Sequence, residues 1–452
     1  MRLNIVPGSS CIGNVEIHEA SRVIELDAGH FKDSNKTGDG NGNPLGSKTG
    51  DGNVPFSHAS LRAIESQLAI IVPCMNEELT ILDGVLHGIP HECLIILVSN
   101  SNHCNFRNER ALLSDFCHST QRQGISIHQQ DEGLAYAFRV AGMPELVVEK
   151  HMPQVKRQSV LRIRNGKGEA MMIGTAIAKL TKKQFVGFID ADNFVAGSVH
   201  EYCKAYAAGL HYATRYTDCS NTRTSSGIAY SASKPYAMVR IKWNSKPKVK
   251  DGKLVFEKSG RCSRVVNEWM NRLSNALGSD DIQSEVIQTA NAGEHAMSLE
   301  LAMKLRFATG YAVEPFQLID MWEQFGTETD SYGVSYSTKD TAAPPRRKVQ
   351  ILQIETRNPH FHDISKGHEH IQRMQLQGLS TIYHSSLTPP ALKDALWAFM
   401  TTDSTFDVQA FGAPEEARVY SPMKMMDFQA FRLALKAHAD TVTVSGDAAF
   451  LF

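Results

Sequence analysis

Apolar runs that alternate with helix-forming segments constrain the fold of this chain more than any other feature. Four such runs, each bounded by polar residues, predict strands at residues 67–74, 93–99, 125–130 and 184–190. Between them, helical patterns are found at residues 80–89, 109–124 and 166–183. This alternation is typical of a parallel, doubly wound sheet, so we predict an α/β fold with a Rossmann-like topology. No GxGxxG motif follows the first strand, and a dinucleotide-binding fingerprint is therefore missing.

Changes in composition and periodicity divide the chain into four segments. Residues 1–64 are expected to form an N-terminal hairpin with a Gly- and Asn-rich surface insertion at 28–53, which is too polar to bury a core. Residues 65–220 form the Rossmann-like half, and residues 221–390 form a less regular second half. Residues 391–452 are predicted to be a helical extension that packs on the sheet or against a second copy of the chain.

Local patterns predict several elements in the second half. Two strands joined by a Lys-rich hairpin around Asp251-Gly252 are expected within residues 226–258. Glu314 is expected to end a short apolar strand. Amphipathic helices are predicted at residues 265–278, 295–307 and 370–384.

Charge and cysteine usage exclude several classes of protein. The formal net charge of −1 gives no reason to expect nucleic acid or an anionic membrane as a partner. The eight cysteines include no CxxC pair, which argues against zinc ribbons and thioredoxin-like proteins and suits free thiols in a reducing compartment. The N-terminus lacks the apolar core of a signal peptide, and no apolar run approaches the roughly 20 residues that span a bilayer. We therefore expect a cytoplasmic protein.

The strand at residues 184–190 leads directly into Asp190-Ala191-Asp192-Asn193. In open α/β sheets, ligands bind just beyond the carboxyl ends of the strands. Two carboxylates at such an end can supply hard oxygen ligands to Mg²⁺ or Mn²⁺, which substrate phosphates would share. The alternative is that Asp190 and Asp192 only cap a turn.

Two basic motifs are candidate anion sites. Gly166-Lys167-Gly168 begins a predicted helix, where backbone N–H groups and an ammonium can meet a phosphate, although an exposed basic turn is the alternative. Residues 259–264 (SGRCSR) place hydroxyls, a glycine and two guanidiniums before another helix. Because cations at a helix N-terminus oppose its dipole, an anionic ligand such as an acidic metabolite is favoured there.

Two strand ends and an extended run offer weaker candidates. The turns at Asn76-Glu77 and at Ser99 could hold a nucleoside, or could be ordinary turn chemistry. Glu294 could bond sugar hydroxyls, with Glu314 as its rival. In the run at residues 350–363, which also contains Arg357, alternation places His360 and His362 on one face, where either could join the aspartates at a metal.

These motifs, in this order, resemble those of mannosyl-3-phosphoglycerate synthases. They cover about residues 65–390 and read VPxxNEE, VSNS, RNGKGE, DADN, SGRxSRV, GEHAMSLELA, GYxVEP and ETRNPHFH. The family consists of retaining glycosyltransferases of the GT-A fold. The resemblance therefore implies that fold, with a helical C-terminal region added, and transfer of mannose from GDP-mannose to 3-phosphoglycerate with retention at the anomeric carbon.

The resemblance also implies roles for individual residues. A divalent ion, Mg²⁺ or Mn²⁺, would be bound by Asp192 with His360 or His362, and Asp190, Asp192 and Lys167 would carry the catalysis. The expected donor-binding residues are Pro73, Asn76, Glu77, Ser99, Lys167, Asp190, Ala191 and Glu294. The expected acceptor-binding residues are Gly260, Arg261, Ser263, Arg264 and Arg357.

Other functions and the mechanism stay open at this point. No Asp or Glu can be assigned as a nucleophile, so our working hypothesis is a front-face route in which the leaving phosphate helps to deprotonate the acceptor. Glucosyl-3-phosphoglycerate synthases share this plan, and a catalytically silent regulator that binds nucleotide sugars is a further alternative. A homodimer is compatible with the sequence.

Overall fold

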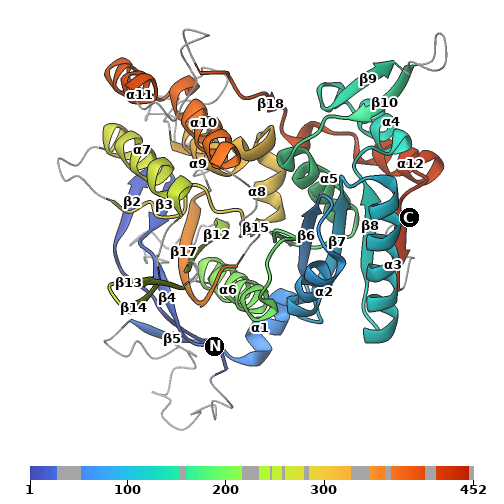
Figure 1. Cartoon of the computed structure of the whole chain (residues 1–452), viewed down its shortest axis with the longest axis horizontal. Coiled ribbons are helices and arrows are strands. Elements are labelled where there is room, and N and C mark those ends of the chain that lie inside the picture. The colour runs from blue at the N-terminus through green and yellow to red at the C-terminus, as the bar shows by residue number, and fades with distance from the viewer. Residues whose placement is uncertain are drawn as a thin grey trace, which may run out of the picture.

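The computed structural model describes residues 1–27, 52–151, 159–215, 234–244, 247–256, 260–278, 285–326, 347–361, 368–402 and 414–446. Most of the predicted insertion at residues 28–53, and His362, lie outside these ranges. The described strands centre on one mixed sheet of 13 strands that carries helices on its faces (Figure 1). None of the described helices is long and apolar enough to cross a membrane.

The Rossmann-like half is present as predicted. Four parallel strands lie side by side in the order β8-β7-β6-β11, with helices in the connections between them. Their bounds are β6 (Leu68–Cys74), β7 (Leu94–Ser99), β8 (Gly124–His128) and β11 (Phe185–Phe188). The connecting helices are α2 (Leu79–Gly88), α3 (His103–Thr120) and α5 (Lys167–Leu180). The predicted α/β class is confirmed.

Both faces of this sheet are buried, which explains why its strands are continuous apolar runs. Along β6, Leu68, Ile70 and Val72 pack into one hydrophobic core, and Ala69 and Ile71 pack into the core on the opposite face. Side chains alternate between the faces of a strand, so a strand covered on both sides is apolar at every position.

Several elements of this half were not predicted from the sequence. Helix α4 (Glu132–Val140) and the antiparallel pair β9 (Val147–His151) and β10 (Ser159–Ile163) are inserted between β8 and α5. Helix α6 (Ala196–Arg215) follows β11.

An antiparallel strand at the centre of the sheet corrects the prediction for residues 295–307. Residues 295–298 form β15 (His295–Ser298), which pairs antiparallel with β11 and with β12 (Tyr236–Asn244), and only α8 (Leu299–Lys304) is helical. A short apolar run suits a buried strand as well as a helix, and pairing on both edges decides for the strand. The prediction for Glu314 was also wrong, because it lies in the first turn of α9 (Val313–Met321).

The outer strands come from both ends of the chain. Beyond β12 lie β17 (Val349–Pro359) and the N-terminal strands, and at the opposite edge β19 (Thr443–Ser445) pairs with β8. The N-terminal strands are β1 (Arg2–Asn4), β2 (Ser9–Ile12), β3 (Val15–His18), β4 (Ser21–Glu25) and β5 (Asn53–Pro55). All four sequence segments therefore contribute to one sheet.

The C-terminal region packs on the sheet domain. Helix α12 (Phe428–His438) lies against α4, where the ring centroids of Phe431 and Phe138 are 4.8 Å apart. The other described elements of the C-terminal half are α7 (Arg261–Leu277), β16 (Phe307–Ala308), α10 (His368–His384), α11 (Pro390–Thr402) and β18 (Val419–Tyr420). Near the N-terminus, α1 (His58–Glu65) packs against α6.

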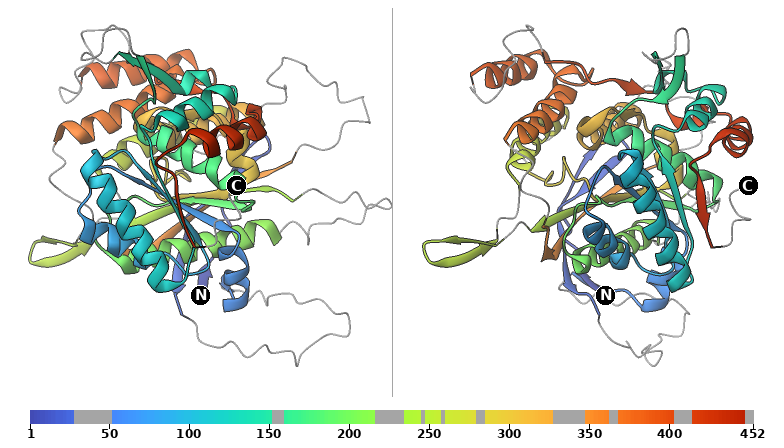
Figure 2. Two further views of the ribbon diagram at one scale, coloured as in Figure 1. Left: turned by 90° about the vertical axis from the view of Figure 1, so that its right-hand side faces the viewer. Right: turned by 45° about the vertical axis from the view of Figure 1, so that its right-hand side comes forward.

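The predicted Lys-rich hairpin is present. It consists of β13 (Pro247–Lys250) and β14 (Lys253–Phe256), and Figure 2 shows it projecting from the body of the protein. Asp251 and Gly252 have φ angles of 51° and 72°. Positive φ at both central residues matches the two-residue turn that an Asp-Gly pair favours.

Candidate active site

The antiparallel direction of β15 brings distant polar residues to one edge of the sheet. His295, the first residue of β15, pairs with Phe188, the last residue of β11. Because the two strands run in opposite directions, the residues before His295 meet those after Phe188. Gly293 and Glu294 therefore lie beside Asp190, where the sequence alone left Glu294 in a loop leading to a helix.

Lys167 is held between two carboxylates at this edge. Its Nζ lies 2.6 Å from Asp190 Oδ1 and 2.9 Å from Glu314 Oε1, and only 14% of its side chain is exposed. Burial alone would lower the pKa of Lys167, but Asp190, Glu314 and Glu294 outweigh it and raise that pKa well above its ordinary value. Lys167 is thus a fixed positive charge that starts α5.

Glu294 belongs with Lys167, Asp190 and Glu314 to one group of charged side chains, called the Lys167 cluster below. The residue is 2% exposed, and its Oε1 has no hydrogen-bond partner among the described residues. Burial, then the negative charge of Asp190, raises the pKa of Glu294 well above its usual range. Oε2 of Glu314 is likewise buried without a partner. Two such oxygens beside a lysine can accept hydrogen bonds from ligand hydroxyls.

Gly293 and Arg240 shape this cluster, and sequence reasoning missed both. A Cβ on Gly293 would lie 2.7 Å from Asp190 Oδ2 and 2.8 Å from Lys167 Nζ, so a larger residue would displace at least one of these two side-chain ends. The fully buried Arg240 donates to the carbonyls of Thr289 and Glu314, at 2.9 and 3.1 Å. It thereby ties the loop before β15 to the first turn of α9.

The turn that carries Asp192 lies against the end of β17. Phe194 N donates to Phe361 O at 2.8 Å, and Asn193 Nδ2 lies 3.3 Å from His360 Nδ1. Tyr202 Oη lies 3.2 Å from the same nitrogen, and the indole of Trp243 stacks on the imidazole with centroids 4.5 Å apart. The structure therefore brings His360 beside the aspartate motif.

Side chains at the ends of β6 and β7 are engaged within the protein. Asn76 has a φ of 59°, and its Oδ1 accepts hydrogen bonds from Asn102 and Asn105. The Ser99 hydroxyl is fully buried and donates to Glu109 Oε2 at 2.6 Å. This geometry favours the turn interpretation for these two side chains. Pro73 and Glu77 are half-buried on the same rim, and Ala191 is buried between the aspartates.

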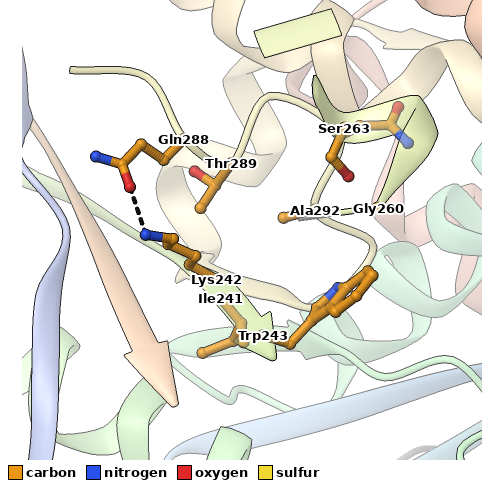
Figure 3. Close-up of a pocket in the computed structure, with 9 residues that line it drawn as sticks. Ile241, Lys242, Trp243, Gly260, Ser263, Gln288, Thr289 and Ala292 are labelled. Atoms are coloured by element: carbon orange, nitrogen blue, oxygen red, sulfur yellow. Dashed lines mark hydrogen bonds between the residues drawn. The ribbon is translucent and has the colours of Figure 1, made fainter. Parts of the chain in front are cut away.

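Gly260 and Ser263 line a small hollow beside the cluster, with Lys242 and Trp243 of β12 opposite them (Figure 3). Gly260 is the residue before α7, and a Cβ there would lie 3.3 Å from the Trp243 ring. The remaining lining residues are Ile241, Gln288, Thr289, Asn291 and Ala292. This position suits the acceptor-binding role predicted for the motif.

The predicted acceptor arginines are only partly placed here. Arg264 is exposed on α7, and the side chain of Arg261 lies outside the described part of the structure. Arg357 was expected at the acceptor, but it does not line the hollow. Its Nη1 donates instead to the carbonyl of Ile24 in β4 at 2.6 Å, because the end of β17 lies beside that strand.

A profile of the family described as mannosyl-3-phosphoglycerate synthase matches residues 7–435. The chain belongs to this family. It is 34% identical to the mannosyl-3-phosphoglycerate synthase of Pyrococcus furiosus over 433 residues, which are 95% of this chain and 96% of that relative. It is 29% identical to the Aeropyrum pernix enzyme of the same name over 399 residues, or 88% of each chain.

The solved structures that the comparison found are more distant. One is glucosyl-3-phosphoglycerate synthase from Mycobacterium tuberculosis in complex with Mn²⁺, uridine-diphosphate-glucose and glycerol 3-phosphate. It is 18% identical, with a TM-score of 0.42, and the match covers 75% of this chain and 87% of that one.

Proposed function

We propose that this chain transfers mannose from GDP-mannose to 3-phosphoglycerate, with retention of the anomeric configuration. The observation that carries the proposal is the Lys167 cluster, since its ammonium at the carboxyl edge of the sheet lies next to a hollow lined by Gly260 and Ser263 of the SGRCSR motif. Membership of the family supports the same reaction. The nearest alternative is a glucosyl donor, and a homodimer in the cytoplasm remains an expectation.

A divalent ion, Mg²⁺ or Mn²⁺, fits the residues beside this cluster. Asp192 would supply a carboxylate and His360 an imidazole nitrogen. A metal-bound imidazole donates its other N–H, and Tyr202 Oη, 3.2 Å from Nδ1, is placed to accept it. No group of three or more His, Cys, Asp or Glu residues is arranged for a metal within the described ranges. Substrate phosphates commonly complete such sites.

The leaving group of the reaction is a nucleoside diphosphate, and the residues of the cluster suit its departure. Lys167 would hold the diphosphate and stabilise the charge that grows as the glycosidic bond breaks. A divalent ion held by Asp192 and His360 would supply further charge stabilisation for the leaving group. Glu294 and Glu314 would accept hydrogen bonds from sugar hydroxyls through the oxygens that lack partners.

The acceptor would lie between α7 and β12. Gly260 precedes α7 without a side-chain cap, so the first backbone N–H groups of this helix are available to a phosphate, and Ser263 adds a hydroxyl. The hydroxyl to be glycosylated would then face the donor cluster, and the leaving phosphate would take its proton.

Product stereochemistry tests this route. We expect ¹H NMR at early times to show the α-mannosyl product, with the configuration of GDP-mannose retained. We expect no covalent sugar on Asp190, Glu294 or Glu314 when the enzyme is quenched during turnover and analysed by mass spectrometry. An inverted product, or a sugar trapped on one of these carboxylates, would contradict the front-face route.

A further inference from the structure

We propose that Lys242 binds the carboxylate of the acceptor and so selects 3-phosphoglycerate over phosphorylated alcohols. The inference rests on the proposed function and adds a residue that the SGRCSR motif does not contain. It concerns the second anionic group of the acceptor, which carries a phosphate at one end and a carboxylate at the other.

Lys242 lies on the opposite wall of the hollow from the predicted phosphate motif. It is on β12, whereas Gly260 and Ser263 are at the start of α7 (Figure 3). Lys242 is the only cationic residue among the described residues that line the hollow. An acceptor that places its phosphate on α7 therefore has one lysine available for its other end.

The surroundings of Lys242 hold its ammonium in place. Nζ lies 2.6 Å from Gln288 Oε1 and 3.0 Å from Glu355 Oε2, and 15% of the side chain is exposed. Gln288, which lines the same hollow, and Glu355 together hold the ammonium in place. A charge held this way loses little further side-chain entropy when a ligand binds, and partial burial strengthens its attraction for an anion.

Lys242 shares its carboxylate partner with a second cation. Arg22 Nε of β4 lies 3.8 Å from the same Glu355 Oε2 that contacts Lys242. Two cations thus share one carboxylate, and Glu19 adds a second carboxylate to the wall that Arg22 and Lys242 line. Lys242, Gln288, Glu355 and Arg22 also line a second hollow against the N-terminal strands, so the group forms a wall between two hollows.

A purely structural role for Lys242 makes a different prediction. Lys242 and Glu355 are register neighbours on the paired strands β12 and β17, so their ion pair could simply join the strands. Loss of a structural ion pair would change the KM values of all acceptors alike. Loss of a contact with the acceptor carboxylate would raise the KM only of acceptors that have a carboxylate.

The test compares 3-phosphoglycerate with glycerol 3-phosphate, which lacks the carboxylate. For Lys242→Met we expect the KM for 3-phosphoglycerate to rise about 10- to 100-fold, the usual effect of losing a hydrogen bond to a charged group. The KM of glycerol 3-phosphate as acceptor, or its inhibition constant against 3-phosphoglycerate, should stay within about twofold. Lys242→Arg keeps the positive charge, so its KM for 3-phosphoglycerate should be close to that of the wild type. Equal changes for both compounds would overturn the proposal.

A second variant keeps the test decisive if Lys242→Met folds poorly. Glu355→Gln removes the negative charge beside the ammonium, and we expect a severalfold lower KM for 3-phosphoglycerate with no gain for glycerol 3-phosphate. Damage to the fold cannot produce such a gain, and an equal or higher KM would contradict the inference. If the wild-type protein does not glycosylate 3-phosphoglycerate at all, the proposed function fails before the role of Lys242 is addressed.

Discussion

Lys167→Met is expected to lower kcat/KM about 100- to 1000-fold, the scale on which removal of one group that stabilises transition-state charge acts. Lys167 is the ammonium between Asp190 and Glu314, and both carboxylates would remain at the cluster without it. The variant therefore loses the contact with the leaving diphosphate and gains repulsion toward it. Steady-state kinetics with GDP-mannose and 3-phosphoglycerate measures the effect.

A matched control separates catalysis from stability. Lys204 has the same side-chain exposure of 14% and pairs with the buried Glu65 at 2.6 Å, between α6 and α1. Removing one partner of a buried ion pair destabilises by about 3–5 kcal/mol, so Lys167→Met and Lys204→Met should both lower the melting temperature. Only Lys167→Met should lose turnover. Similar activity losses in both variants would assign Lys167 a structural role.

Gly293→Ala tests the same cluster without removing a charge. The added methyl group would lie within 3 Å of both Lys167 Nζ and Asp190 Oδ2, so one of the two must move. We expect a loss of activity in the same direction as for Lys167→Met, but smaller. Wild-type kcat/KM in this variant would mean that the lysine–aspartate geometry is not required.

The sequence predicts the parallel half of the fold well because its strands are buried on both faces. Ile70 and Ile71 both lie in a core, one on each side, and this produces an unbroken apolar run that is easy to recognise. The segment at residues 295–298 shows the limit of that signal. Its four residues are a strand only because β11 and β12 pair with both of its edges, and pairing partners are not visible in local sequence.

Three residues of the candidate site could be proposed from the sequence, because each lies in a polar motif at the end of a predicted strand or before or at the start of a predicted helix. Asp190, Lys167 and Glu294 were named from sequence, and the structure places them together. Gly293 and Arg240 carried no such signal, because their roles depend on the antiparallel return of β15 and on carbonyl groups. The contact of Arg357 with β4 was not predicted, because alternation along β17 does not reveal which strand lies beside it.

Asp192→Ala is the second change with a large expected effect. Asp192 follows the buried β11 strand and lies in the turn beside His360, so its loss would remove the proposed carboxylate ligand of the divalent ion. We expect turnover to fall about 1000-fold or more, because charge stabilisation of the leaving diphosphate depends on the ion. EPR of free Mn²⁺ during a titration in the presence of GDP should show that Asp192→Ala binds the ion more weakly than the wild type does.

The control for this change is an aspartate that caps a helix away from the candidate site. Asp427 caps α12 by accepting hydrogen bonds from Gln429 N and Ala430 N, and Asp427→Ala should cost about 1 kcal/mol of stability with normal kinetics. If Asp192→Ala retains turnover within about tenfold and binds Mn²⁺ as the wild type does, Asp192 is not a metal ligand.

The most direct measurement is turnover of the purified protein with GDP-mannose, GDP-glucose and UDP-glucose against 3-phosphoglycerate, with and without Mg²⁺ or Mn²⁺. Released nucleoside diphosphate and the sugar product are both quantified. We predict metal-dependent formation of mannosyl-3-phosphoglycerate from GDP-mannose. Turnover with a glucosyl donor alone would keep the site but contradict the proposed donor, and donor binding without any product would contradict the transferase activity itself.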